Sequence, residues 1–443
     1  MANETTSVID LGTEAELIEL YSWPNIKGSK ESLKSTILHW FNQTLKNDGF
    51  CGDKAATANI VVKSKSYALY LTGPKSLKGY QDRLPKFLNH GRAALKRIAV
   101  IQAEDVKRAE KAKAKGAKPP KKHWDPRGVG DWRFFLPLGL PLINQRSVQF
   151  FHYPPIRLLE TNRDYLDDPV PKRWEELLVA NGVKPENVAL YEAVMDSVPV
   201  GASDEEGSAK GGGMPINDFV DYQKSQVELL LGEPNSDGFT MPIVVYGANP
   251  RKRFWMSYKK GFPESVQTAG TWGIKDPQRV QIREGCTTSV LAMNHPYSFF
   301  MDIQSKKGDD FIPGVTGFWQ AGAGKMLESL IAARWQKQMA ATPSQDPIAV
   351  YKDCQAYWGT LDDKYVPAAK PQQREAAAAL ILHQGSLDAG VTGTWKFVRD
   401  LETSQKIVTE FKQNGAVKQE SLLPAEKASM INDMLKFLCA KSS

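Results

Sequence analysis

The distribution of strand signals constrains the fold more than any other feature of this sequence. Short runs of β-branched and aromatic residues, which are typical of strands, recur through the first two thirds of the chain. After Gly317 they are replaced by apolar stripes at helical spacing, such as Leu327, Ile331, Trp335 and Met339. Together the two patterns predict an α+β (mixed) body followed by a C-terminal α-helical bundle.

The chain length predicts several domains. A single hydrophobic core stops growing at about 250–300 residues, and this chain has 443. The central region also contains an acidic, Gly-rich insertion at 200–213 that buries little apolar surface and is expected to be flexible. We expect an N-terminal α+β region ending in a long basic helix (1–115), a basic Pro/Lys linker (116–130), a central α/β region (131–315) and a C-terminal helical region (316–443).

Individual elements follow from local patterns. Apolar residues at helical spacing predict a helix over 33–45, and the Ala, Lys, Arg and Glu content of 89–115 predicts a second helix that Gly116 ends. Two β-branched and aromatic runs, 60–62 and 67–71, predict a strand pair. Further strands are expected at 132–136, 147–152, 242–246 and 287–293.

The net charge is concentrated in one segment. The whole chain carries +7, but residues 92–127 alone contain twelve basic and four acidic side chains, a net charge of +8. A local excess of one sign attracts a polyanion and makes the association sensitive to salt. The residues expected to add such non-specific affinity are Lys107, Arg108, Lys111, Lys113, Lys115, Lys118, Lys121 and Lys122. The alternative is a solvated charged helix and linker that bind nothing.

A second basic motif follows the strand expected at 242–246. Five cations and three aromatic residues occur within ten positions, in what we expect to be a loop at the end of that strand. We expect Arg251, Lys252, Arg253, Lys259 and Lys260 to hold phosphates, and Phe254, Trp255 or Tyr258 to stack on unpaired bases. In the alternative interpretation Phe254 and Trp255 anchor the loop in the core, and the cations are only solvated.

The catalytic motifs in this sequence are incomplete. The segment Gly317–Met326 resembles a phosphate-binding loop, but Ala323 separates the glycines and Met326 replaces the hydroxyl residue, so we expect a glycine-rich approach to a helix. His295 and Pro296 follow a strand near Asp302, which resembles the His-Pro loop of uracil-DNA glycosylases. That resemblance implies that His295 stabilises a departing base. The water-activating acidic motif of that family is not found upstream.

Other features restrict the environment of the protein. The four cysteines are far apart without C-x-x-C spacing, and the six histidines form no pair at i, i+3 or i, i+4, so neither a zinc site nor a disulfide scaffold is expected. No apolar run approaches the roughly 20 residues that cross a bilayer. We expect an intracellular protein, in the cytoplasm or in the nucleoid or nucleus, without a membrane partner and without a cofactor.

These patterns lead to one functional hypothesis and two rivals. We expect a non-enzymatic subunit of a ribonucleoprotein or nucleocapsid-like assembly that binds single-stranded nucleic acid, RNA rather than DNA. Its helical C-terminal region is expected to contact other subunits or a second copy of the chain. The first rival is an α/β enzyme acting on nucleic acid, glycosylase-like or a hydrolase, that uses a His295 loop. The second is a structural capsid or scaffold protein.

Overall fold

The structure is a computed structural model in which the chain forms two compact units. It describes residues 7–10, 56–62, 65–71, 74–118, 147–151, 176–183, 193–196, 220–294, 315–359, 371–392, 401–417 and five residues between 431 and 439. The first unit comprises Met1–Pro171, Ala189–Gly273 and Gln278–Val290, and the second comprises Lys172–Val188, Ile274–Pro277 and Leu291–Ser443. The helix expected at 33–45, the strand expected at 132–136, and the insertion 200–213 lie outside the described residues.

A small sheet precedes the long helix of the first unit. Strand β1 (Ser7–Asp10) pairs in parallel with β2 (Ala56–Val62), which pairs antiparallel with β3 (Lys65–Leu71). Ile60 lies opposite Tyr67 in this register. The predicted strand pair is therefore confirmed. It forms because β-branched and aromatic side chains pack well on a pleated surface.

The basic helix is longer than its sequence pattern predicts. Helix α3 runs over Pro74–Ala114, so the expected helix at 89–115 is confirmed and begins earlier, at a proline suited to a first helical turn. It ends in a left-handed turn, where Gly116 has φ of 62° and the amide N of Ala117 donates to the carbonyl O of Ala112 over 2.9 Å. Glycine at this position therefore stops the helix.

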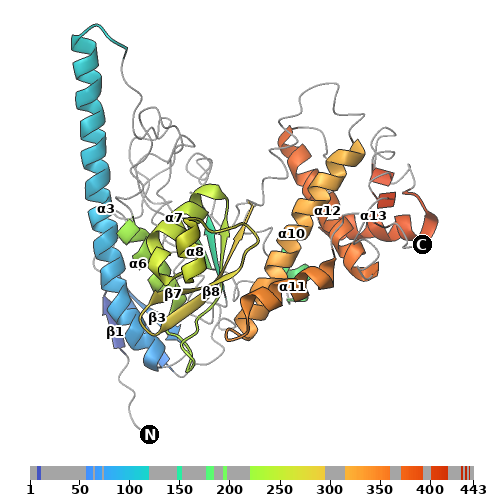
Figure 1. The fold of residues 1–443 in the computed structure, drawn as a ribbon, viewed down its shortest axis with the longest axis horizontal. Helices are drawn as coiled ribbons and strands as arrows, with labels where there is room; N and C mark the ends of the chain where they lie inside the picture. Colours follow the sequence, from blue (N-terminus) through green and yellow to red (C-terminus); the bar gives the residue numbers. More distant parts are fainter. Residues whose placement is uncertain are drawn as a thin grey trace. The chain divides into compact units, whose positions relative to one another are not determined.

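A mixed five-stranded sheet lies mainly in the first unit, and only the last residues of one strand belong to the second. Its order is β5 (Ala193–Asp196), β4 (Val148–Phe151), β6 (Ile243–Tyr246), β8 (Cys286–Met293) and β7 (Gln278–Arg283). Strand β4 pairs in parallel with β5 and β6, whereas β7 and β8 are antiparallel. The strands expected at 147–152, 242–246 and 287–293 are confirmed. Helices together with this sheet make an α+β body (Figure 1).

Three helices lie in the chain on either side of β6. Helix α6 (Val220–Leu231) precedes that strand and packs against α3, while α7 (Ala248–Tyr258) and α8 (Glu264–Ala269) follow it. A one-turn 3-10 helix, η6 (Lys259–Gly261), extends α7 and passes so close to β7 that a Cβ at Gly261 would collide with the Gln281 backbone. Only glycine fits this approach.

The second unit contains the helices of the C-terminal region. They are α10 (Val315–Ala341), α11 (Pro347–Trp358), α12 (Pro371–Thr392) and α13 (Leu401–Asn414). The predicted apolar stripe is buried in α10, where Trp335 and Met339 have no exposed surface. The expectation for Gly317–Met326 is wrong, because this segment lies inside α10 instead of leading to it. From position 319 onward its amide groups therefore belong to the hydrogen-bond ladder of the helix.

Residues 176–183 belong to the second unit although they precede much of the first unit in the chain. The Asn181 side chain donates to the Leu330 carbonyl over 3.1 Å and accepts from the Trp358 indole over 2.9 Å. Glu176 pairs with the buried His383 over 2.8 Å. These contacts fasten the segment to α10, α11 and α12, since a buried polar side chain is stable only when it is hydrogen-bonded.

Candidate nucleic-acid interface

The basic and aromatic motif of residues 250–260 forms a helix, so the expectation of a loop there is wrong. Helix α7 begins directly after β6, and Gly247, with φ of 93°, makes the turn between the two elements. Positive φ costs glycine little, which allows the chain to reverse within a single residue. Side chains along a helix change face with a period of 3.6 residues. Some residues of the motif therefore face the core, and others face the solvent.

The inward face of α7 carries part of the motif into the core. Phe254 is fully buried and Tyr258 is 4% exposed, and the Phe254 ring contacts the rings of Phe150, Phe262 and Trp272. Neither Phe254 nor Tyr258 presents a face for stacking. The core-anchor interpretation therefore holds for Phe254, while Tyr258 turns inward with it.

Arg253 also lies on the inward face of α7. It is only 1% exposed, and loss of hydration lowers its pKa to about 9. A guanidinium in this position lies below the surface that a strand of nucleic acid would touch. Arg253 is therefore removed from the set of residues expected to hold phosphates.

The outward face of α7 retains the other members of the motif. Lys252 and Met256 are exposed, and Arg251 and Trp255 are half-buried. The Lys259 ammonium lies over the Trp255 ring, 5.1 Å from its centroid, in a cation–π contact. We define the outward face of α7 as Arg251, Lys252, Trp255, Met256, Lys259 and the adjoining Lys260, which is exposed.

The cations of this face have no acidic partner among the described residues. Arg251, Lys252, Lys259 and Lys260 form no ion pair with a described residue. Several lysines and arginines elsewhere in the described part of the chain are paired with carboxylates. Unpaired cations beside a partly exposed indole provide both the charge and the ring that a single strand requires.

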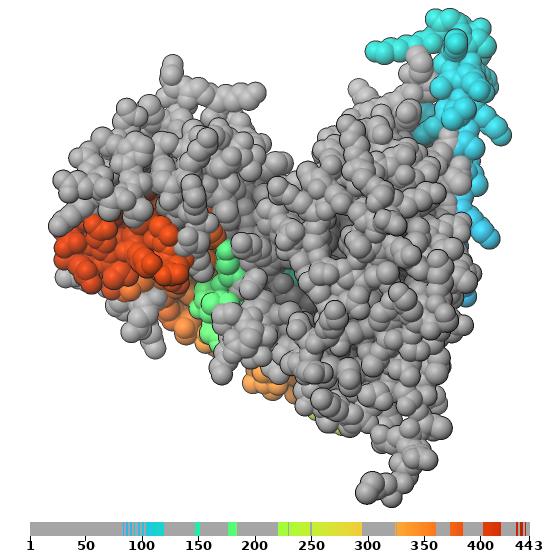
Figure 2. Space-filling view, turned by 180° about the vertical axis from the view of Figure 1, so that it is seen from behind, coloured from blue at the N-terminus to red at the C-terminus, as the bar shows by residue number. Residues whose placement is uncertain are grey.

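The second group of predicted residues lies at the C-terminal end of α3. We define the basic tract of α3 as Lys107, Arg108, Lys111, Lys113, Lys115 and Lys118. All its lysines are exposed, and only Arg108 is paired, with Asp105 over 3.2 Å. Figure 2 shows side chains of this end, in cyan, on the surface. Lys121 and Lys122 lie outside the described residues.

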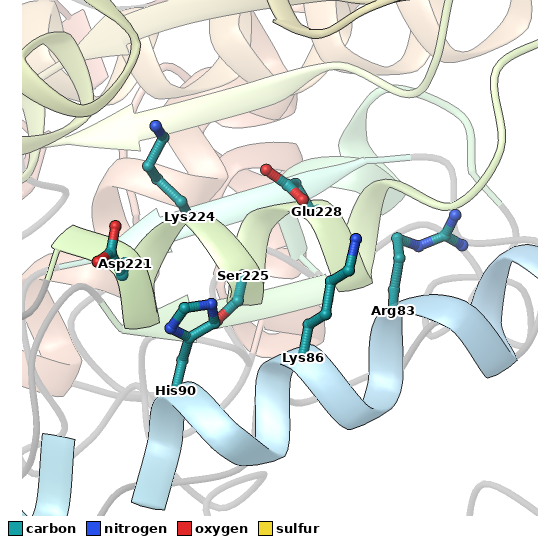
Figure 3. Close-up of a pocket in the computed structure, with 7 residues that line it drawn as sticks. All are labelled: Arg83, Lys86, His90, Asp221, Lys224, Ser225 and Glu228. Carbon is teal, nitrogen blue, oxygen red and sulfur yellow. The ribbon is translucent and has the colours of Figure 1, made fainter. Parts of the chain in front are cut away.

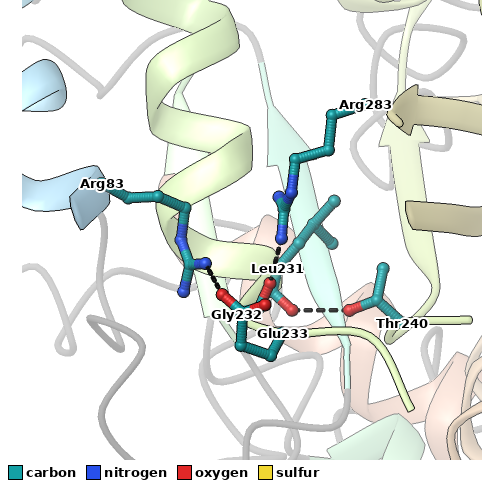
Figure 4. Close-up of polar contacts among 6 residues, drawn as sticks. All are labelled: Arg83, Leu231, Gly232, Glu233, Thr240 and Arg283. Atoms are coloured by element: carbon teal, nitrogen blue, oxygen red, sulfur yellow. Dashed lines mark hydrogen bonds and ion pairs between the residues drawn. The ribbon is translucent and has the colours of Figure 1, made fainter. Parts of the chain in front are cut away.

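The N-terminal half of α3 is fixed to the sheet side of the unit by polar contacts around the end of α6 (Figure 4). Arg83 of α3 pairs with Glu233, and Arg283 of β7 donates to the Gly232 carbonyl over 2.7 Å. Thr240 donates to the Leu231 carbonyl. Burial lowers the pKa of Arg83, and hydrogen bonding to Glu233 opposes that shift. The start of α3 is therefore held in place while its end remains in solvent.

A polar cavity of about 150 Å³ lies between α3 and α6 (Figure 3). Its residues come from one face of each helix: Arg83, Lys86 and His90 from α3, and Asp221, Lys224, Ser225 and Glu228 from α6. None of these seven was predicted as a site residue. The spacing of residues 83, 86 and 90, and that of residues 221, 224, 225 and 228, each indicate a common helical face. Nothing in the sequence indicates that the two faces meet.

The two residues of the catalytic alternative, His295 and Asp302, lie outside the described residues. Within the described part of the chain, no group of three or more His, Cys, Asp or Glu residues is placed to hold a metal ion. No helix there combines the length and apolar character needed to cross a membrane. Comparisons with protein families, with curated proteins and with solved structures found no match to this chain.

Proposed function

We propose that this protein binds single-stranded nucleic acid, RNA rather than DNA, through the outward face of α7. The observation that carries the proposal is the arrangement of Lys252, Trp255 and Lys259 on one side of a helix, with exposed cations on either side of a half-buried indole. The aromatic ring offers a stacking surface, and the lysines offer charge to the phosphates beside it.

The rigid attachment of α7 supports this role. The helix is anchored by Phe254 within an aromatic cluster, and Tyr258 donates a hydrogen bond to the Lys224 carbonyl of α6 over 3.3 Å. Burial raises the pKa of Tyr258, so its hydroxyl stays neutral. A site held by packed side chains loses less conformational entropy on binding than a flexible loop does.

The basic tract of α3 acts as a second, non-specific contact. Its exposed lysines lie on an end of the helix that projects beyond the packed part of α3, where Ile101 and Asp105 are the last buried residues among those described. Charges of this kind neutralise phosphates without reading sequence. The tract therefore adds affinity and salt dependence but no selectivity.

The protein works as a subunit of a ribonucleoprotein or nucleocapsid-like assembly. Helices α10 to α13 form the C-terminal bundle and supply the contact with other subunits or with a second copy of the chain. Contacts of α10 with α11 and α12, and of α12 with α13, support this arrangement. In this proposal the first unit binds nucleic acid and the second unit contacts other subunits.

Binding of a fluorescent single-stranded RNA, followed by anisotropy at several salt concentrations, tests the proposal. The variant Lys252→Gln/Lys259→Gln/Lys260→Gln removes three cations from the face. The control Lys352→Gln/Lys406→Gln/Lys436→Gln removes three exposed lysines from the second unit. We expect weaker binding and a salt slope smaller by about 2 in the first variant only, since each lost phosphate contact removes about 0.7.

The same titrations contain the results that would contradict the proposal. Equal losses in the two triple variants would show that total charge, and not the outward face of α7, controls binding. Unchanged binding in both triple variants would show that the outward face of α7 does not bind the strand. A DNA strand of the same sequence tests the preference for RNA, which we expect to be bound more tightly because it carries 2′-hydroxyls.

A further inference from the structure

We propose that the cavity between α3 and α6 accepts a guanine base of the bound strand, with Glu228 and Lys86 recognising its edge. This inference rests on the proposed function, because the base is delivered by a strand already held at α7. Helix α6 connects the two places, since it lines the cavity through Glu228 and contacts α7 through Lys224 and Tyr258.

Three of the seven polar residues that line the cavity already have partners among the described residues. Arg83 pairs with Glu233, and the Ser225 hydroxyl donates to the Tyr222 carbonyl over 2.7 Å. The Lys224 ammonium lies 5.7 Å from the centroid of the Tyr258 ring, on the α7 side. These contacts already engage the three side chains, which shape the walls of the cavity.

Lys86 and Glu228 have no partner of this kind among the described residues. They come from different helices and line the same cavity, and in Figure 3 the Lys86 side chain extends from α3 toward α6. No hydrogen bond or ion pair joins either side chain to another described residue, nor do they pair with each other. Two opposite charges that line one cavity without pairing leave room for a ligand that offers donors to the carboxylate and acceptors to the ammonium.

Guanine has this combination of groups. Its N1–H and 2-amino group are adjacent donors that a carboxylate accepts together, and O6 and N7 are acceptors that a lysine contacts. Adenine and cytosine present an amino group without an adjacent ring N–H, and uracil has a single ring N–H. The pair of Glu228 and Lys86 therefore selects guanine among the four bases.

The size and the exposure of the cavity suit a base from a single strand. A cavity of about 150 Å³ accepts an aromatic ring, and the exposed Lys86 and Asp221 place its rim in solvent. Bases in single strands are unstacked easily and are recognised through hydrogen bonds on their edges. A splayed base can enter without disruption of a duplex.

The experiment uses four labelled 12-nucleotide RNAs: oligouridine, and oligouridine with one central guanosine, adenosine or inosine. With the full-length protein we expect the guanosine strand to bind about fivefold tighter or more than oligouridine, in the range of a good base contact. Inosine lacks the 2-amino group and should lose most of this gain. Glu228→Gln and Lys86→Met should each reduce the guanosine preference to less than about twofold, with binding of oligouridine by Glu228→Gln unchanged.

A carboxylate outside the cavity serves as the control. Glu264→Gln removes an exposed carboxylate of α8 and should keep the full preference for guanosine. If oligouridine binds but guanosine gives no gain in the unaltered protein, the base site is wrong and the proposed function stands. If no strand binds at moderate salt, the proposed function fails as well.

Discussion

The two basic segments of the first unit differ in how the fold treats their charges. In α7 the motif is divided, so that Arg253 and Phe254 are buried while Lys252 and Trp255 reach the surface. In the basic tract of α3 all the lysines remain exposed, and only Arg108 is paired. A run of cations therefore does not reveal by itself how many of them can meet a ligand. The first segment forms a shaped surface, whereas the second provides charge alone.

The largest effect should come from the buried side of α7. Phe254→Ala removes a fully buried ring from an aromatic cluster, so we expect the free energy of unfolding to fall by about 3–5 kcal/mol. Urea denaturation measures this change. Trp255→Ala, one residue further along the helix, should cost much less. Similar losses in both variants would contradict the division of α7 into two faces.

The exposed side of α7 should control affinity instead of stability. Trp255→Ala is expected to weaken binding of single-stranded RNA by about 1–3 kcal/mol, the value of one stacked base. Trp255→Phe keeps an aromatic ring and should restore most of the affinity. Anisotropy titrations at fixed salt distinguish the variants. An alanine variant that binds like the unaltered protein would exclude stacking at this position.

The basic tract of α3 should act through salt alone. Replacing Lys111, Lys113, Lys115 and Lys118 by glutamine is expected to lower the slope of log affinity against log salt by about 3 at most. The loss should be the same for every base composition. A variant that changed the preference for guanosine would show that this tract does more than neutralise phosphates.

The smallest effect concerns the end of α3 as a structural element. Ala114→Gly lowers local helix propensity by about 1 kcal/mol, but residue 114 is exposed and lies beyond the last buried residues described in this helix. The global unfolding free energy should therefore change by less than about 0.5 kcal/mol. Amide hydrogen exchange should be faster only near the helix end. A large global loss would place this end in the cooperative core.

The sequence predicts elements whose signals are local. The strands at 60–62, 67–71 and 287–293 and the long basic helix are confirmed, because β-branched runs and helix formers act over a few residues. Helix α7 is not predicted, since cations and aromatic residues at the end of a strand also suit a functional loop. Its helical form depends on packing of Phe254 against β4 and against Trp272, which are distant in the chain.

The candidate site was predictable only in part. The local charge excess predicts the lysines of both segments, but it does not separate Arg253 from Lys252. The burial of these two differs because helical period and tertiary packing place them on different faces. The cavity was missed altogether. Glu228 and Lys86 are separated by about 140 positions, and only the fold brings α3 and α6 together.

Lysine acetylation followed by mass spectrometry tests the central claim most directly, because it reports on individual side chains of the unaltered protein. With saturating single-stranded RNA we predict that Lys252, Lys259 and Lys260 become protected at moderate salt, while the exposed Lys352 and Lys436 of the second unit react as before. Unchanged reactivity at Lys252, Lys259 and Lys260, in a sample that demonstrably binds the strand, would contradict the account.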